Sequence, residues 1–163
     1  MLTADYALRA KTNASFAAAA DRVREELAAE GFGVLCEIDV QATLEKKLGV
    51  QIEPYLILGA CNPLLAHRAL EAEPDLGVLL PCNVVVSEHA GKTRIAAIDP
   101  ERMLSIVGNA ELAPVAAEVR GRLANVVRRA AARPVSGFCP GRVGGVTDGR
   151  RAIAREHAVE RRR

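Results

Sequence analysis

The sequence predicts one domain of mixed helices and strands, followed by a basic tail. Segments with the two-residue apolar repeat of half-buried strands alternate with segments that have helical spacing. The early alternation of strand and helix fits a parallel α/β sheet. A first strand with one polar side and a hairpin late in the chain fit an antiparallel α+β sheet instead. The residue patterns alone leave both arrangements open.

The first two predicted strands are separated by one helix. Residues 6–10 alternate between apolar and polar side chains, which is typical of a strand with one solvent-facing side. Ser15 is a favourable N-cap for the helix that follows, and Gly31 ends that helix. Residues 34–40 alternate again and place Cys36 on the more apolar side of the second strand. We therefore expect Cys36 to lie in the core.

The third strand is also predicted to lie between helices. Asp39 caps a short helix that ends at Gly49, and residues 55–60 then form an apolar run. Because this run is apolar on both sides, it predicts a central strand that is covered on both faces. Asn62 followed by Pro63 is typical of the start of another helix.

The remaining elements are a hairpin and two helices. Pro81 cannot donate to a strand ladder, so it predicts a bend, a bulge or an edge position. Gly91 marks a hairpin turn, and Asp99 caps a short helix. The last helix, near residues 112–130, has an apolar seam with spacings of three and four residues that consists of Ala116, Val119, Leu123, Val126 and Ala130.

Charge divides the chain near residue 132. Residues 1–132 carry 14 Lys and Arg against 17 Asp and Glu, a net charge of −3, whereas residues 133–163 carry 8 Arg against 3 acidic residues, a net charge of +5. The density of Pro and Gly from Arg133 onward predicts a mobile, solvated tail, with an arm for an anionic partner or nucleic acid as the alternative. With only 3% aromatic residues, the domain itself is not typical of a nucleic-acid binder.

Neither targeting nor metal-binding motifs are evident. The N-terminal residues lack a basic segment followed by an apolar run, and the longest uncharged stretch, residues 54–66, has 13 residues where a membrane span needs about 20. We therefore expect a cytoplasmic protein without a membrane partner. The spacing of Cys36, Cys61, Cys82 and Cys139 is not that of a zinc site, so free thiols are expected in a reducing cytosol.

Cys61 is the first candidate for chemistry. It ends the predicted buried strand and directly precedes the helix start at Asn62. Unpaired amides and the positive end of the helix dipole at such a position stabilise a thiolate and lower the pKa of the thiol below its usual value of about 8.5. The alternative is that Cys61 is a small buried hydrophobic residue at a crowded strand end.

The step Cys82-Asn83 repeats the step Cys61-Asn62, and the two could meet at one end of the sheet if their strands are neighbours. Two thiolates with a third ligand from His67 or a second chain would form a soft-metal site, and a redox pair is a further alternative. The candidate ligand-binding residues are Cys61, Asn62, His67, Cys82 and Asn83, and the candidate metal ligands are Cys61 and Cys82. The sequence identifies no cofactor, and no catalytic residue other than the candidate Cys61.

Five segments in this order resemble a known family, namely residues 31–40 (GFGVLCEIDV), 58–63 (LGACNP), 66–70 (AHRAL), 80–86 (LPCNVVV) and 97–100 (AIDP). Together they resemble the bacterial and archaeal domain of unknown function 302 family over residues 5–130. The resemblance implies an α+β fold with a curved, mainly antiparallel sheet, helices on one face, and homodimers. It implies no activity, and because most relatives have Thr at the position of Cys36, it assigns that residue no role.

Two functions are therefore predicted. The first is a homodimeric, non-enzymatic domain that binds a small ligand, a soft metal or a protein partner at the end of the sheet with Cys61, Asn62, Cys82 and Asn83. It is favoured because the sequence contains no nucleotide-binding loop and no hydrolase motif. The alternative is a thiol-dependent redox protein or enzyme that uses Cys61 as nucleophile and Cys82 as resolving thiol.

Overall fold

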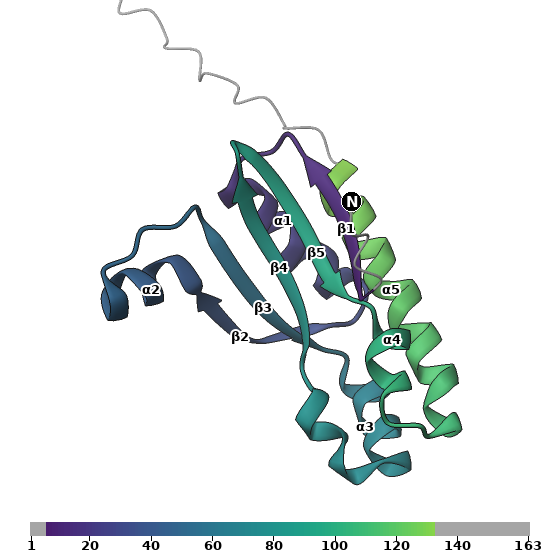
Figure 1. The fold of residues 1–163 in the computed structure, drawn as a ribbon. Helices are drawn as coiled ribbons and strands as arrows, with labels where there is room; N and C mark the ends of the chain where they lie inside the picture. The colour runs from purple at the N-terminus through teal and green to yellow at the C-terminus, as the bar shows by residue number, and fades with distance from the viewer. Residues whose placement is uncertain (1–5, 133–163) are drawn as a thin grey trace, which may run out of the picture.

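The computed structural model describes residues 6–132 and shows a five-stranded antiparallel sheet with strand order β1-β5-β4-β3-β2 (Figure 1). The predicted tail at 133–163 and Cys139 lie outside the described residues. The strands are β1 (Ala7–Thr12), β2 (Gly33–Asp39), β3 (Tyr55–Cys61), β4 (Cys82–His89) and β5 (Lys92–Ile98). The α+β class is confirmed, and the parallel alternative is wrong, because every neighbouring pair of strands is antiparallel.

Helices connect the strands and cover one side of the sheet. The α-helices are α1 (Phe16–Ala29), α2 (Val40–Leu48), α3 (Pro63–Ala72), α4 (Pro100–Ser105) and α5 (Ala113–Ala132), with short 3-10 turns η1 (Pro74–Leu79) and η2 (Ala110–Leu112). Both α1 and α5 contact the sheet, whereas α2 projects beyond β2 at the left of Figure 1.

The predicted helix starts are confirmed by their capping hydrogen bonds. The carboxylates of Asp39 and Asp99 accept bonds from the backbone amides two or three residues later, at 2.8 and 3.0 Å. The side chains of Ser15 and Asn62 do the same at 3.3 and 3.2 Å. These polar side chains satisfy amides that no helix carbonyl can reach, which fixes where each helix begins.

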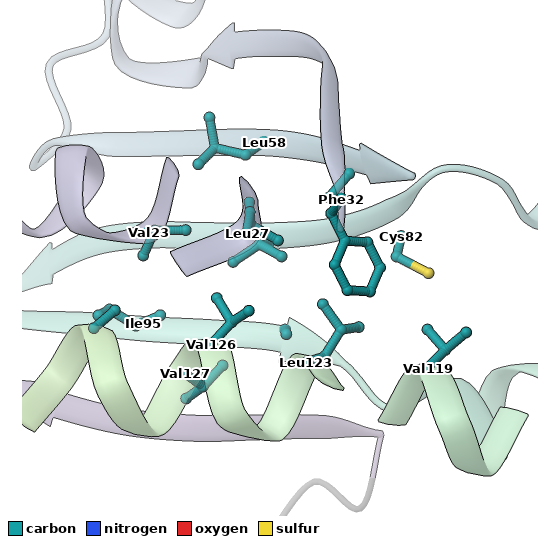
Figure 2. Close-up of a cluster of buried hydrophobic side chains, with 14 of the residues drawn as sticks. Val23, Leu27, Phe32, Leu58, Cys82, Ile95, Val119, Leu123, Val126 and Val127 are labelled. Atoms are coloured by element: carbon teal, nitrogen blue, oxygen red, sulfur yellow. The ribbon is translucent and has the colours of Figure 1, made fainter. Parts of the chain in front are cut away.

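The core lies between the sheet and the α1–α5 layer. Figure 2 shows Val23 and Leu27 of α1 facing the same space as Leu58 of β3 and Ile95 of β5. All five members of the predicted seam on α5 are buried there. The aliphatic composition of the sequence is thus sufficient for a continuous core, because Ala residues let the helices approach the sheet closely.

Two burial predictions are wrong for one physical reason. Strand β3 is an interior strand, but on the side opposite the core only Gly59 is buried, while Tyr55 is exposed and Ile57 is partly exposed. Cys36, expected in the core, is exposed. It lies on the edge strand β2, and its side of the sheet is the one opposite α1 and α5. The apolar pattern of these strands predicted burial on both faces, but the helices cover only one face of the sheet.

The residue Pro81 follows a cis peptide bond and directly precedes β4, the central strand of the sheet. The predicted bend at Pro81 is therefore confirmed, because the proline lies outside the ladder that begins at Cys82. The hairpin at Gly91 is confirmed as well. Ala90 and Gly91 both have positive φ, of 51° and 69°, which is typical of the two-residue turn that matches strand twist.

Candidate functional site

The face of the sheet opposite α1 and α5, called the open face below, carries a row of side chains that crosses all five strands. Its members are cross-strand partners in the order Arg9, Ala96, Val85, Ile57 and Ile38. Side chains alternate between faces along a strand, so these residues point away from the core. Four of the five are apolar, and each is only partly buried or exposed. A contiguous apolar row that no helix covers is a candidate interaction site.

A second row beside the first is polar. Lys11 is paired with Arg94, Arg94 with Ser87, and Ser87 with Tyr55. Residues of both rows on β1, β4 and β5 line a hollow of about 860 Å³. Side chains on β1 and β5 therefore place cationic groups directly beside the apolar row.

A niche at Gly59 lies on the other side of the apolar row. Gly59 is the cross-strand partner of both Cys36 and Asn83. A Cβ atom at Gly59 would lie 2.6 Å from Cys36 Sγ and 2.8 Å from Pro81 Cγ, so only glycine leaves room for these two side chains.

The two cysteines that were expected to act together both line one small cavity, but burial opposes a thiolate at each of them. Cys82 is the partner of Ala60 on the core side, where it is buried against Phe32 and α5 (Figure 2). Burial raises the pKa of the Cys82 thiol to about 11, and the charge of Cys61 adds to this rise. Burial also raises the pKa of the Cys61 thiol, which is opposite to the lowering expected from the helix dipole.

The remaining candidate residues have structural partners. Asn62 is buried and caps α3, while His67 is 73% exposed with its Nδ1 3.3 Å from Glu71 Oε2. Strands β3 and β4 are neighbours, so the two Cys-Asn steps do meet, but Asn83 faces the open side and Cys82 the core. Within residues 6–132 no cluster of three or more His, Cys, Asp or Glu could hold a metal ion.

The cavity that Cys61 and Cys82 line is too small for a ligand. It has a volume of about 30 Å³ and an apolar lining that includes Phe32, Leu104 and Val119. That volume accommodates about one water molecule, which would find few polar partners there. The open face, which the sequence patterns did not identify, is therefore the better candidate site.

We expect the thiols to react with iodoacetamide in the order Cys36, Cys61, Cys82. The thiolate is the nucleophile, so a raised pKa lowers the reactive fraction of Cys61 and Cys82 at a given pH, and Cys82 is also buried. Peptide mass spectrometry after timed alkylation at neutral pH measures each rate separately, and Cys82 should react only after unfolding in urea. Faster alkylation of Cys61 than of Cys36 below pH 7 would contradict this order and favour the hypothesis that Cys61 is a thiolate with a lowered pKa.

Comparison with known proteins gives a family and a solved structure. The family model "Domain of unknown function DUF302" matches residues 8–130. The crystal structure of an uncharacterized conserved protein DUF302 from Bacillus stearothermophilus is 31% identical, with a TM-score of 0.74, and the match covers 78% of this chain and 99% of that one. A search of curated proteins finds no match.

Among residues 6–132, no helix has both the length and the apolar character of a membrane span.

Proposed function

The chain belongs to the DUF302 family, and we propose that it is a homodimeric binding domain whose open face is the binding surface. The observation that carries this proposal is the uncovered apolar row formed by Ala96, Val85, Ile57 and Ile38. A sheet of an isolated domain that is stable in water normally keeps polar side chains on its solvent face. An apolar row on that face is instead expected where a partner or ligand removes it from water.

A second copy is the partner that we propose for the region around β2. Ten large apolar side chains are exposed in the described residues, and half of them lie in one segment: Leu35, Ile38, Leu48, Val50 and Tyr55. We call these five residues the β2 corner. Helix α2 in the same segment has no buried residue, and β2 is an edge strand with unpaired backbone groups. Self-association through a two-fold axis would cover this surface in both copies at once.

We expect Ile38→Glu to convert the protein from a dimer to a monomer. Ile38 is 45% exposed on the open face, so the carboxylate meets water in the monomer but would be buried without a partner in the dimer. The mass measured by size-exclusion chromatography with light scattering should fall by half, while the circular dichroism spectrum stays unchanged.

The matched control is Ile106→Glu. Ile106 is 78% exposed and follows α4, away from the β2 corner, so its substitution should leave the mass unchanged. A wild-type protein that is monomeric, or a dimer that survives Ile38→Glu, contradicts the proposal.

Thiol chemistry at Cys61 is the less favoured function. This function requires a thiolate at Cys61, but burial raises the pKa of that thiol and so favours its neutral form. The proposed resolving thiol of Cys82 lies on the core side of the sheet. Rapid alkylation of Cys61 in the experiment above would favour it again.

A further inference from the structure

We infer that the β1–β5 half of the open face binds an amphiphilic carboxylate, a small molecule with an apolar body and one anionic end. This inference rests on the proposed function only in that the open face is a binding surface, and it does not require a dimer.

Two like charges face each other across β1 and β5. Lys11 and Arg94 are direct cross-strand partners on the open face, and Arg9 lies two residues from Lys11 on the same side of β1. Like charges that are directly opposite in a sheet destabilise it. Residues 1–132 have a net charge of −3, so three neighbouring cations are not a consequence of general composition. An anion placed between them would offset the repulsion.

Within residues 6–132, no carboxylate forms an ion pair with Lys11 or Arg94. The nearby carboxylate of Glu53 accepts a hydrogen bond from the Ala90 amide at 2.9 Å and lies 3.6 Å from His89 Nδ1. The guanidinium of Arg9 lies over the ring of Tyr6, 5.2 Å from its centre. An anionic ligand would supply the negative charge that Lys11 and Arg94 do not receive from residues 6–132.

Apolar side chains lie directly beside these cations. Val85 and Ala96 line the hollow together with Lys11 and Arg94, and their strands are contiguous. The volume of about 860 Å³ lies within the range of small-molecule sites, roughly 300–1,000 Å³. A simple inorganic anion would leave the apolar row exposed, and a nucleic acid would make no use of it. A carboxylate on an apolar chain would contact both rows.

The test uses three probes with the full-length protein in isothermal titration calorimetry. Decanoate has both the charge and the apolar body, acetate has only the charge, and decyltrimethylammonium has the apolar body with the opposite charge. We expect decanoate alone to bind, and Arg94→Gln to weaken it about tenfold through loss of a charge-assisted hydrogen bond. The same variant, without ligand, should unfold at the same temperature as the wild type or higher, because the repulsion from Lys11 is relieved.

The matched control is Arg68→Gln. Arg68 is an exposed arginine on α3, 3.6 Å from Glu118 and outside the hollow, so decanoate affinity should be unchanged. The inference is overturned if decanoate does not bind, if decyltrimethylammonium binds equally, or if Arg68→Gln weakens binding as much as Arg94→Gln. It is also overturned if polyuridylate binds in an Arg94-dependent manner while decanoate does not. Decanoate binding to a monomeric Ile38→Glu variant would support the ligand site and separate it from the dimer.

Discussion

Replacing Leu58 by Ala should lower the free energy of unfolding by about 2–5 kcal/mol. Leu58 is fully buried on the core side of β3, where Figure 2 shows it above Val23 and Leu27 of α1. The truncation removes apolar contacts and leaves a cavity that the sheet and α1 cannot close, because both are held by their other contacts. Urea unfolding followed by circular dichroism measures the change from the shift in midpoint at constant slope.

The control for Leu58 uses the same substitution at the surface. Leu64 is 69% exposed in α3, and Leu64→Ala should change the free energy of unfolding by less than about 0.5 kcal/mol. A small effect of Leu58→Ala would contradict the packing of α1 against β3. It would also weaken the assignment of the opposite face as open, since the two faces are distinguished by the burial of residues such as Leu58.

Replacing Gly59 by Ala should cost about 1–3 kcal/mol, although it adds only one methyl group. The added Cβ would lie 2.6 Å from Cys36 Sγ and 2.8 Å from Pro81 Cγ, so the two side chains or the strands must shift. Gly77→Ala is the matched control, since no heavy atom lies within 4 Å of a Cβ at that position. Urea unfolding of both variants should separate the steric cost from the general effect of replacing glycine.

A second substitution identifies which neighbour causes the cost. In Cys36→Ala/Gly59→Ala the sulfur is gone and only Pro81 remains close, so part of the lost stability should return. Cys36→Ala alone should have a small effect, because Cys36 is exposed on the edge strand. Strictly additive effects of the two substitutions would show that Cys36 does not lie over Gly59.

Much of the fold could be predicted from short-range patterns in the sequence. The caps at Ser15, Asp39 and Asp99 mark helix starts because a side-chain oxygen satisfies amides two or three residues away. The seam of α5 was predictable because helical spacing within 20 residues determines which side chains share a face. Neither inference requires knowledge of distant residues.

The candidate site was predicted less well, because it depends on strand pairing and on coverage. Cys61 and Cys82 were expected to act together, and both line one cavity, but that cavity holds about one water molecule and burial raises the pKa of both thiols. The row of Ile57, Val85 and Ala96 was not identified at all, since each residue lies on a different strand. The alternation of apolar residues along each strand could be seen in the sequence, but only the pairing of the strands brings these three residues together into one surface.

The sequence by itself determined the α+β composition, the order of the elements, the helix starts and the aliphatic nature of the core. These properties follow from local backbone preferences and from the periodicity of apolar residues. The tertiary structure decided that α1 and α5 pack on the same side of the sheet, which leaves Cys36 exposed and the cations of β1 and β5 beside an apolar row. Apolar strand residues are alike in sequence whether a helix or solvent lies above them, so coverage is a property of long-range packing alone.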